Sequence, residues 1–349
     1  MTTQAIKIFV FGKDNVGWSI DKDREAITNF LKLNNFKITK NILQATHIFC
    51  VWYDLLLSRK YKWILYLKKV LNKKLLAIIT NDITVYPEKL DMLKRYVDVF
   101  IAPSQGIYEY LKGKKIKVFV IPFFVDPKIF RSMKLSKEDI CKKLKIDYFK
   151  IRNKTVIGSF VRDSLGRDLS QPKWQKNPDL LIAILSNLPK EKYLLLLGGP
   201  RRHYIIRKCK VEKIPFLFYG KESPIYQQRD DILSNNLDLK TINYLYNLSD
   251  IYIISSRNEG GPKQVLESAL TKTLVFSTKV GLVPDFIHPY LIYEKNNLRV
   301  LVEKINRFLD NKRNFEEYIE YNFLKAKKEM DSDKLKEKYK KLFWNSNEN

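Results

Sequence analysis

Two carboxylates, two glycines and a proline stand close together in the segment Arg257–Asp285, which reads RNEGGPKQVLESALTKTLVFSTKVGLVPD. Glu259 opens the string E-G-G-P, and Glu267 follows it after seven intervening residues. A carboxylate accepts hydroxyl hydrogens from two groups at once, and glycine lets a backbone approach a ligand without a Cβ in between. These residue types therefore predict a site for a hydroxyl-rich ligand.

The elements that must position these residues are a strand, a loop and a helix. Ile251–Ile254 is a short apolar run typical of a buried parallel strand, and Leu274–Phe276 starts another. The segment between them predicts a helix, so the stretch from Glu259 to Pro262 is expected at the carboxyl end of a strand, where a helix begins. Ligands bind at that edge of open α/β sheets, and N–H groups at a helix start attract anions or hydroxyls. Glu267 is expected on about the same face as the start of that helix.

The full string resembles the donor-sugar signature of retaining GT-B glycosyltransferases of the GT4 type, the glycosyl transferases group 1. The resemblance is carried by E-G-x-P, the second glutamate, the small pair Ser268-Ala269 and the closing V-G-x-x-P-D of Val280–Asp285. Two glutamates at this spacing, taken alone, occur by chance on many solvated helices. Here, however, the loop, helix, strand and glycine turn come in the order that the site requires. The alternative is a capped surface helix with two unrelated acids, which does not need Gly-Gly-Pro at its start.

Short apolar runs alternate with helical stretches along the chain, which predicts an α/β fold with parallel sheets. The first series comprises Ile6–Phe11, His47–Val51, Leu75–Ile79, Val99–Ile101 and Val118–Ile121. The second series comprises Val156–Phe160, Tyr193–Leu197, Phe216–Phe218, Ile251–Ile254 and Leu274–Phe276. A charged, irregular linker is expected over residues 126–154, and helix is expected over 313–343.

The resemblance implies a GT-B fold, in which two Rossmann-like doubly wound domains face each other across an interdomain cleft. Two domains also suit the length, because 349 residues exceed what one hydrophobic core usually supports. We expect an acceptor-side Rossmann-like domain over residues 1–125 and a nucleotide-sugar-binding Rossmann-like domain over 126–329. Residues 330–349 are expected to form a helix that returns to the N-terminal domain.

The resemblance places two cations at the diphosphate of the donor. Lys176 stands where the family carries a lysine before the first helix of the donor domain, and a helix start suits a phosphate. Arg162 is the expected second cation, with Arg167 as another candidate, and a solvated loop cation is the competing interpretation. Arg201 and Arg202 follow a glycine turn and are expected to be solvated rather than to meet a phosphate.

The resemblance also implies roles for the signature residues. Glu259 is expected to hold hydroxyls of the transferred sugar, and Glu267 to accept the ribose hydroxyls of the nucleotide. The rest of the expected donor site is the turn Gly260, Gly261, Pro262 and Lys263. In it, the N–H groups of Gly260, Gly261 and Lys263 are expected to touch the sugar or the diphosphate.

The acceptor side departs from the family pattern. Asn81 stands in the N-terminal domain where many relatives carry a histidine near the reacting carbon. An asparagine cannot shuttle protons, but its amide still hydrogen-bonds a sugar hydroxyl or the acceptor. Glu259 and Asn81 are therefore the candidate catalytic residues. Retention in the family is attributed to front-face attack, with the leaving phosphate taking the acceptor proton.

No metal and no cofactor are expected, since the nucleotide sugar is itself a substrate. Asp21-x-Asp23 spells the D-x-D of metal-dependent transferases, but it sits at an expected helix start, where acids favourably meet the dipole. The glycine loop from Gly12 to Gly17 lacks Gly-Lys-Ser/Thr, so a P-loop is not supported. Three widely spaced cysteines fit a reduced compartment without disulfides.

A formal net charge of +26 predicts attraction to polyanions such as an anionic membrane surface, a lipid diphosphate or nucleic acid. Lysine-rich helices also follow from plain helix propensity. The block Tyr61–Lys74 alternates basic residues with Trp and Tyr at near-helical spacing, which suits a helix lying on an anionic interface. A core helix with a basic outer edge is an equally open interpretation. The expected interfacial lysines are Lys68, Lys69, Lys73 and Lys74.

The sequence thus predicts a hexosyltransferase-like enzyme that moves a sugar from a nucleotide sugar to a glycan or lipid-linked acceptor, with no role for nucleic acid. The N-terminus runs straight into a strand, so a cytoplasmic location is expected, free or held peripherally at the inner membrane face. The alternative function is a non-catalytic, basic GT-B-like protein that binds nucleic acid or a glycan surface. The intact Glu259, Glu267 and Lys176 favour catalysis.

Overall fold

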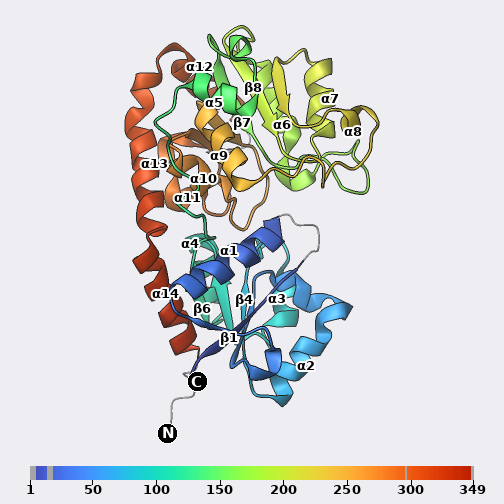
Figure 1. Ribbon diagram of the computed structural model, residues 1–349, viewed down its shortest axis with the longest axis vertical. Helices are drawn as coiled ribbons and strands as arrows, with labels where there is room; N and C mark the ends of the chain where they lie inside the picture. Colours follow the sequence, from blue (N-terminus) through green and yellow to red (C-terminus); the bar gives the residue numbers. More distant parts are fainter. Residues whose placement is uncertain (1–4, 14–18, 295–296, 347–349) are drawn as a thin grey trace. The chain divides into compact units, whose positions relative to one another are not determined.

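The computed structural model describes residues 5–13, 19–294 and 297–346. Contacts between residues divide the chain into two units. The N-terminal unit comprises Met1–Phe124, Glu259–Gly261 and Lys328–Asn349, and the C-terminal unit comprises Val125–Asn258 and Pro262–Lys327. Each unit is built on one six-stranded sheet (Figure 1).

The sheet of the N-terminal unit has the strand order β2-β1-β3-β4-β5-β6, and all neighbours are parallel. Its strands are β1 (Lys7–Phe11), β2 (Lys37–Ile38), β3 (His47–Cys50), β4 (Lys74–Ile78), β5 (Val99–Ala102) and β6 (Val118–Val120). The five apolar runs of the first series all form strands. Only β2 has no counterpart among them, because two residues are too short for an apolar pattern.

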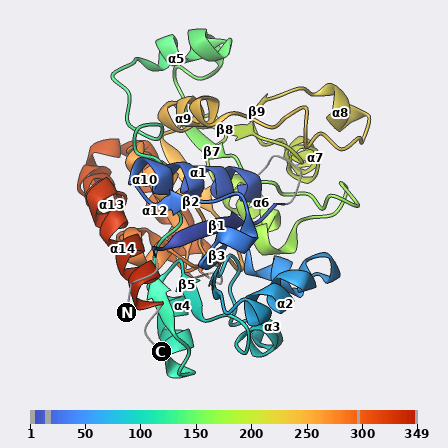
Figure 2. The same cartoon turned by 60° about the horizontal axis from the view of Figure 1, so that its bottom comes forward.

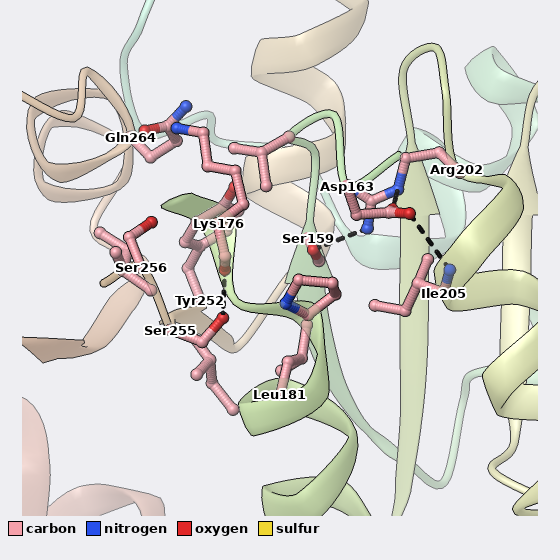
Figure 3. A pocket seen from close by; sticks show the side chains of 14 residues that line it. Ser159, Asp163, Lys176, Leu181, Arg202, Ile205, Tyr252, Ser255, Ser256 and Gln264 are labelled. Atoms are coloured by element: carbon pink, nitrogen blue, oxygen red, sulfur yellow. Dashed lines mark hydrogen bonds and ion pairs between the residues drawn. The ribbon is translucent and has the colours of Figure 1, made fainter. Parts of the chain in front are cut away.

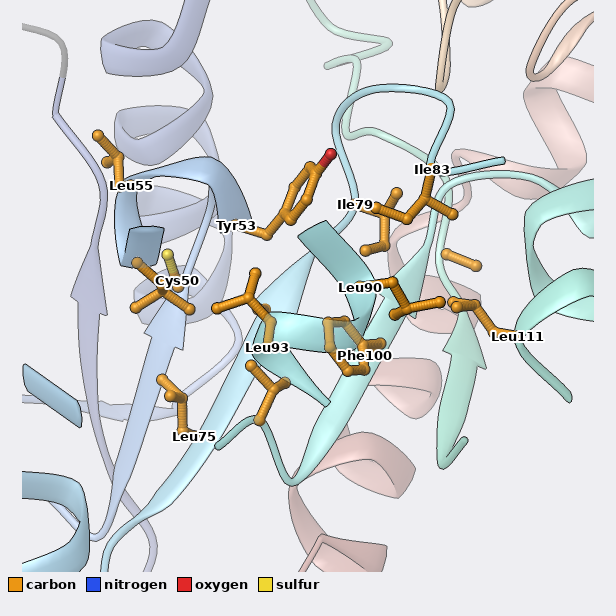
Figure 4. Packing of buried hydrophobic residues seen from close by; sticks show 14 of the residues in the cluster. Cys50, Tyr53, Leu55, Leu75, Ile79, Ile83, Leu90, Leu93, Phe100 and Leu111 are labelled. Carbon is orange, nitrogen blue, oxygen red and sulfur yellow. The ribbon is translucent and has the colours of Figure 1, made fainter. Parts of the chain in front are cut away.

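Both faces of this sheet are covered by helices, because successive strand side chains point to opposite faces. Phe49 of β3 lies 5.8 Å, ring to ring, from Phe343 on the last helix, whereas its neighbours Ile48 and Cys50 belong to the apolar cluster on the other face (Figure 4). The helices of the unit are α1 (Ser19–Leu33), α2 (Lys62–Val70), α3 (Pro87–Leu93), α4 (Gln105–Gly113) and α14 (Ser332–Asn345). Residues of α2, α3 and α4 enter the cluster.

Helix α14 packs against the strands of the N-terminal unit, although most of the chain separates them in sequence (Figure 1, Figure 2). The ring of Phe30 on α1 lies 5.7 Å from that of Tyr339. At the end of α14, the Ser346 hydroxyl lies 2.9 Å from Nε2 of His47. Burial lowers the pKa of His47 to about 4, so this ring is neutral at neutral pH.

Helix α2 buries only Ile64 and presents an aromatic stripe to the solvent. The exposed fractions of Trp63, Tyr66 and Val70 are 46%, 68% and 58%, and their spacing places them on one helical face. Helix α2 therefore packs Ile64 and Leu65 against the core while these side chains lie on its outer face. Among the described residues, no helix has both the length and the apolar composition needed to cross a membrane.

Two of the four lysines expected at an interface have other partners. Lys68 Nζ lies 3.0 Å from Asp98 Oδ1, and Lys73 is buried, where it donates hydrogen bonds to the carbonyl oxygens of Leu43 and Ala45. The expectation is therefore wrong for Lys73, because the strand that follows it carries its side chain inward. The exposed cations beside the stripe are Arg59, Lys60, Lys62 and Lys69.

The sheet of the C-terminal unit has the order β12-β11-β10-β7-β8-β9, again with all neighbours parallel. Its strands are β7 (Thr155–Ser159), β8 (Tyr193–Gly198), β9 (Phe216–Tyr219), β10 (Ile251–Ile254), β11 (Leu274–Thr278) and β12 (Ile292–Tyr293). From β7 the chain proceeds to β8 and β9 on one side, then crosses to β10, β11 and β12 on the other. The order therefore reverses between β7 and β10, which is the place where such sheets bind ligands.

The helices of the C-terminal unit include one in the segment predicted to be an irregular linker. They are α5 (Lys137–Leu144), α6 (Pro178–Ser186), α7 (His203–Val211), α8 (Ser223–Tyr226), α9 (Leu239–Leu248), α10 (Gln264–Leu270), α11 (Val283–Phe286), α12 (Leu298–Asp310) and α13 (Glu316–Glu329), whose last residues cross the unit boundary. At the start of α5, Ser136 and Asp139 form a reciprocal capping box. Lys137 then pairs with Asp250 at 2.6 Å. The prediction of an irregular linker is wrong here, because this capping box starts a regular helix, α5.

Candidate functional site

A pocket lies at the carboxyl ends of β7, β8 and β10, beside the point where the strand order reverses (Figure 3). Its cavity is small, with a volume of about 20 Å³. Apolar side chains such as Leu181 and Ile205 form part of its wall. The polar residues in the wall include Ser159, Asp163, Lys176, Arg202, Ser255 and Gln264. All of them belong to the C-terminal unit.

Lys176 reaches this pocket because the loop before α6 is tied to the loop after β10. The carbonyl oxygen of Lys176 accepts a 3.0 Å hydrogen bond from the Ser255 hydroxyl, and Arg257 donates a 2.8 Å bond to the side-chain oxygen of Asn177. Asn177 adopts a positive φ of 47°, and Pro178 starts α6. The structure thus places Lys176 directly before a helix and in a pocket wall, as the sequence predicted.

The wall contains a second cation, Arg202, and the expected role of Arg162 at the diphosphate stays a prediction. Asp163, the neighbour of Arg162, is in the wall, whereas Arg162 is not among the residues that form it. The expectation that Arg202 is solvated is wrong, since its side chain is wholly inaccessible. It directly precedes α7, and its guanidinium is ion-paired with Asp163 and hydrogen-bonded to Ser159. Arg201 is also ion-paired, at 2.6 Å from Asp230.

Glu267 is oriented by a buried tyrosine that sequence reasoning missed. The hydroxyl of Tyr246, on α9, donates a 2.9 Å hydrogen bond to Oε2 of Glu267, on α10. Burial, with a further effect of the Glu267 charge, raises the pKa of Tyr246 well above its usual value, so the hydroxyl keeps its proton. Tyr252 stands next to it, 5.2 Å ring to ring, and accepts a hydrogen bond from the backbone N–H of Phe160.

The Gly-Gly-Pro turn lies directly before the N-cap residue of its helix. Helix α10 begins at Gln264, with Lys263 as its N-cap, so the N–H groups of Gly260 and Gly261 belong to the loop. The stretch from Glu259 to Pro262 thus lies between the end of β10 and the start of α10, as predicted. Contacts group Glu259, Gly260 and Gly261 with the N-terminal unit, and Pro262, Lys263 and Glu267 with the C-terminal unit.

Asn81 follows β4 in the N-terminal unit and is held by an aspartate. Its side-chain amide donates a 2.9 Å hydrogen bond to Oδ2 of Asp54, whose other oxygen lies 3.0 Å from Lys89 Nζ. Sequence reasoning missed Asp54. The signal was its position as the first charged residue after the apolar run that forms β3.

The metal-like motif lies on a helix. Asp21 and Asp23 are both within α1, and Asp21 is in its first turn. Gly17, the second glycine of the loop after β1, lies outside the described residues. Within the described ranges, no group of three or more His, Cys, Asp or Glu side chains is arranged to hold a metal ion.

Comparison with protein families confirms the resemblance to the glycosyl transferases group 1. Residues 169–325 match the model of the family Glycosyl transferases group 1. TuaC of Bacillus subtilis, assigned to teichuronic acid biosynthesis as a glycosyltransferase, is 24% identical over 245 residues. The match covers 67% of this chain and 54% of TuaC, so the chain spans about half the length of that relative.

Solved structures share the fold at low sequence identity. HepE of Anabaena, crystallised with UDP and glucose, superposes with a TM-score of 0.71 at 12% identity, covering 98% of this chain and 100% of HepE. A glycosyltransferase of Rickettsia africae has a TM-score of 0.67 at 16% identity, with coverage of 99% and 100%. Sucrose-phosphate synthase of Thermosynechococcus elongatus has a TM-score of 0.64 at 14% identity, with coverage of 92% and 77%. The predicted α/β fold of GT-B type, with two Rossmann-like domains, is confirmed.

Proposed function

We propose that this chain, in which residues 169–325 match the glycosyl transferases group 1, is a retaining glycosyltransferase. It moves a sugar, of hexose type, from a nucleotide sugar to a glycan or lipid-linked acceptor. The observation that carries the proposal is the pocket beside the strand-order reversal of the C-terminal sheet, with Lys176 in its wall. A cation in such a pocket suits the diphosphate of a nucleotide.

The donor is bound mainly by groups of the C-terminal unit. Lys176 neutralises the diphosphate, and the Glu267 carboxylate, held by Tyr246, accepts the two ribose hydroxyls. Pro262 and Lys263 shape the turn before α10. The complexes of HepE with UDP and with UDP-glucose support a nucleotide-sugar donor for this fold.

The reacting sugar is held by Glu259, with Gly260 and Gly261 leaving room for it beside the backbone. Asn81 orients the acceptor hydroxyl, and Asp54 fixes the amide for this task. The glycosidic bond to the leaving phosphate breaks as the acceptor oxygen attacks from the same face. The leaving phosphate takes the proton of the attacking hydroxyl, so neither side chain has to be a base. Cationic side chains, without a metal ion, neutralise the negative charge of the leaving diphosphate.

The protein acts in the cytoplasm, and the exposed face of α2 fits the anionic inner leaflet of a membrane. A lipid-linked acceptor would lie in that leaflet. Trp63 and Tyr66 are exposed on one side of this helix, and Lys62 and Lys69 flank them. Aromatic rings enter the headgroup region while lysines meet anionic lipids. Each cation near such a surface contributes on the order of 1 kcal/mol.

The experiment is a thermal-shift screen with UDP, GDP, ADP and CMP sugars, followed by transfer to a hydroxyl acceptor and NMR of the product. A rise in Tm with one nucleotide sugar and a product with the anomeric configuration of the donor are expected. Glu303→Gln, an exposed acid on α12, is the control and should behave as the wild type. Inversion of configuration would refute the retaining mechanism, and no shift with any nucleotide sugar would refute the donor site.

A further inference from the structure

The C-terminal unit contains a second, larger cavity, which we call the outer groove. Its volume is about 690 Å³, and sites for small molecules occupy roughly 300–1,000 Å³. Its walls are the loop after β7 (residues 166–170), one face of α7 and a segment between residues 225 and 230 that includes the end of α8 (Figure 1). Since these segments follow β7, β8 and β9, the outer groove lies at the carboxyl ends of three neighbouring strands.

Helix α7 separates the outer groove from the pocket that contains Lys176. Arg202 and Ile205 line that pocket. His203 and Ile206, in each case the next residue along the chain, line the outer groove. A ligand in the outer groove therefore lies beside the proposed donor site and has its own set of contacts.

Three exposed cations line the outer groove, and they come from two of its walls. They are Arg167 of the loop after β7, and Arg207 and Lys210 of α7. Arg207 donates a 2.7 Å hydrogen bond to the carbonyl oxygen of Ser170. Within the described part of the chain, none of the three forms an ion pair with a carboxylate. Like charges gathered in one groove repel each other, so an anionic ligand would relieve this repulsion.

The two carboxylates in the walls are directed to other partners. Asp230 forms a bidentate ion pair with Arg201, whose Nε and Nη2 lie 3.0 Å and 2.6 Å from its two oxygens. Asp168 accepts hydrogen bonds of 2.9 Å and 2.7 Å from the N–H and the hydroxyl of Ser170, in its own loop. Since the Arg201–Asp230 pair is neutral, the three cations against Asp168 leave an excess of at least two positive charges.

Arg201 ties the two loops of the outer groove together. Its carbonyl oxygen accepts hydrogen bonds from the N–H groups of Asp163 and Ser164, at the start of the loop after β7. Its own N–H donates a 2.7 Å hydrogen bond to Oδ1 of Asp231, in the segment after β9. Gly166 leaves space for the Arg201 guanidinium, because a Cβ there would clash with it. Walls that are already fixed lower the entropic cost of binding a ligand.

The outer groove also offers apolar surface. The ring of Tyr226 is 62% exposed, and Nζ of Lys210 lies 4.5 Å from its centroid. The Tyr226 hydroxyl donates a 2.6 Å hydrogen bond to Glu222, which orients the ring. Leu169 and Ile225 add aliphatic surface to the same walls. A sugar ring presents C–H groups to such a surface, and guanidinium groups bind carboxylates through paired N–H bonds.

We propose that the outer groove binds an acidic oligosaccharide, with Arg167, Arg207 and Lys210 meeting its negative groups and Tyr226 packing on a sugar ring. The groove binds this second ligand whether or not a nucleotide sugar is present. The inference rests on the proposed function only in one respect, which is that the bound oligosaccharide is part of the acceptor. The acceptor is then an acidic glycan that lies beside the donor.

The test measures binding of tetragalacturonate and of the neutral maltotetraose by calorimetry, at low and at raised salt. The wild type should bind tetragalacturonate more tightly by about tenfold or more, and salt should reduce the difference. Arg207→Gln with Lys210→Gln should lower the affinity for tetragalacturonate about ten- to a hundredfold, the effect of a charge-assisted hydrogen bond, and leave UDP affinity unchanged. Tyr226→Ala should weaken the binding of both oligosaccharides.

Arg299→Gln with Arg313→Gln is the matched control, because it removes two exposed charges of the same unit outside the outer groove. An equal loss of affinity in this control would show that only the general charge of the protein attracts the ligand, and would overturn the inference. So would maltotetraose binding as tightly as tetragalacturonate. A single-stranded oligonucleotide that binds far more tightly than tetragalacturonate, through Arg207 and Lys210, would also overturn it.

Transfer assays test whether the oligosaccharide is part of the acceptor. Tetragalacturonate should compete with the acceptor and not with the nucleotide sugar, and competition with the nucleotide sugar would contradict a site outside the donor pocket. If tetragalacturonate binds but no nucleotide sugar does, the outer groove stands and the proposed function fails. If UDP binds but tetragalacturonate does not, the proposed function stands and the inference fails.

Discussion

The Tyr246 hydroxyl donates a 2.9 Å hydrogen bond to Oε2 of Glu267, and this bond joins the end of α9 to the first turn of α10. Tyr246 is wholly buried, so the bond is shielded from water and its geometry is fixed. A carboxylate that must meet two adjacent ribose hydroxyls needs such a fixed orientation. In the proposed donor site, Tyr246 is therefore a positioning residue for Glu267.

Tyr246→Phe keeps the ring and removes only the hydroxyl, so we expect UDP affinity to fall about tenfold while kcat at saturating donor stays within a factor of two or three. Calorimetry and donor-dependent kinetics measure the two effects. Tyr244→Phe, on the same helix, is the control and should leave both unchanged. An equal fall of kcat in the Tyr246 variant would contradict a role limited to donor binding.

Glu259→Ala and Glu267→Ala should separate transfer from donor binding. Loss of the Glu259 carboxylate removes contacts to the reacting sugar, so transfer should disappear with only a modest loss of nucleotide affinity. Loss of the Glu267 carboxylate should lower the affinity for the donor about ten- to a hundredfold, which is the effect of a charge-assisted hydrogen bond. Activity and calorimetry on both variants are the measurement. If both variants keep full activity, the assignment of the donor site is wrong.

Transfer should survive chelation. The proposed cations at the diphosphate are side chains, so no metal ion is needed to neutralise the leaving group. The rate with EDTA should equal the rate without it, and added Mg²⁺ or Mn²⁺ should not raise it. A rate that stops with EDTA and returns with one of these ions would show that the protein depends on a metal.

His47 should make the N-terminal unit sensitive to acid. Its pKa is about 4 in the fold and 6.5 in the unfolded chain. Between these values the unfolded chain binds more protons, so the free energy of unfolding falls as the pH is lowered from about 6.5 towards 4. The full effect is about 3 kcal/mol. Above pH 6.5 the ring is neutral in both states and the contribution does not change.

Urea unfolding at pH 7.5 and pH 5 measures this effect. His47→Gln should be less stable than the wild type at pH 7.5, because it loses the fit against Phe343, but it should lose less stability on acidification. His288→Gln, in the C-terminal unit, is the control and should keep the pH dependence of the wild type in the N-terminal unit. An unchanged pH dependence in the His47 variant would show that other groups cause it.

Binding to anionic lipid should depend on the exposed face of α2. Flotation with vesicles that contain phosphatidylserine should show attachment that fades as salt is raised. Trp63→Ala with Tyr66→Ala should weaken it, and so should Lys62→Glu with Lys69→Glu. Lys143→Glu with Lys240→Glu, at exposed positions of the C-terminal unit, is the control. Indifference to lipid together with tight, salt-sensitive binding of duplex DNA would favour the non-catalytic alternative.

The sequence predicted the strands well because each is a run of buried apolar residues, such as Ile251–Ile254, that needs no knowledge of its neighbours. It missed β12 because two residues carry no pattern. Lys176 was predictable since it stands immediately before an apolar helix. Arg202 was not, because a chain with 64 Lys and Arg residues does not reveal which one turns inward. That direction is set by how the loop after β7 packs on the start of α7, a contact between distant segments.

The position of α14 has a consequence for biosynthesis. The ribosome releases the strands of the first sheet long before it releases the helix that covers one of their faces. Until then Phe49 and Phe30 lack their partners Phe343 and Tyr339, so a nascent chain must carry an uncovered apolar surface through most of translation. Chaperones that shield such surfaces should therefore hold this protein until residues 332–345 emerge, and a truncation before residue 332 should leave it as their long-lived client.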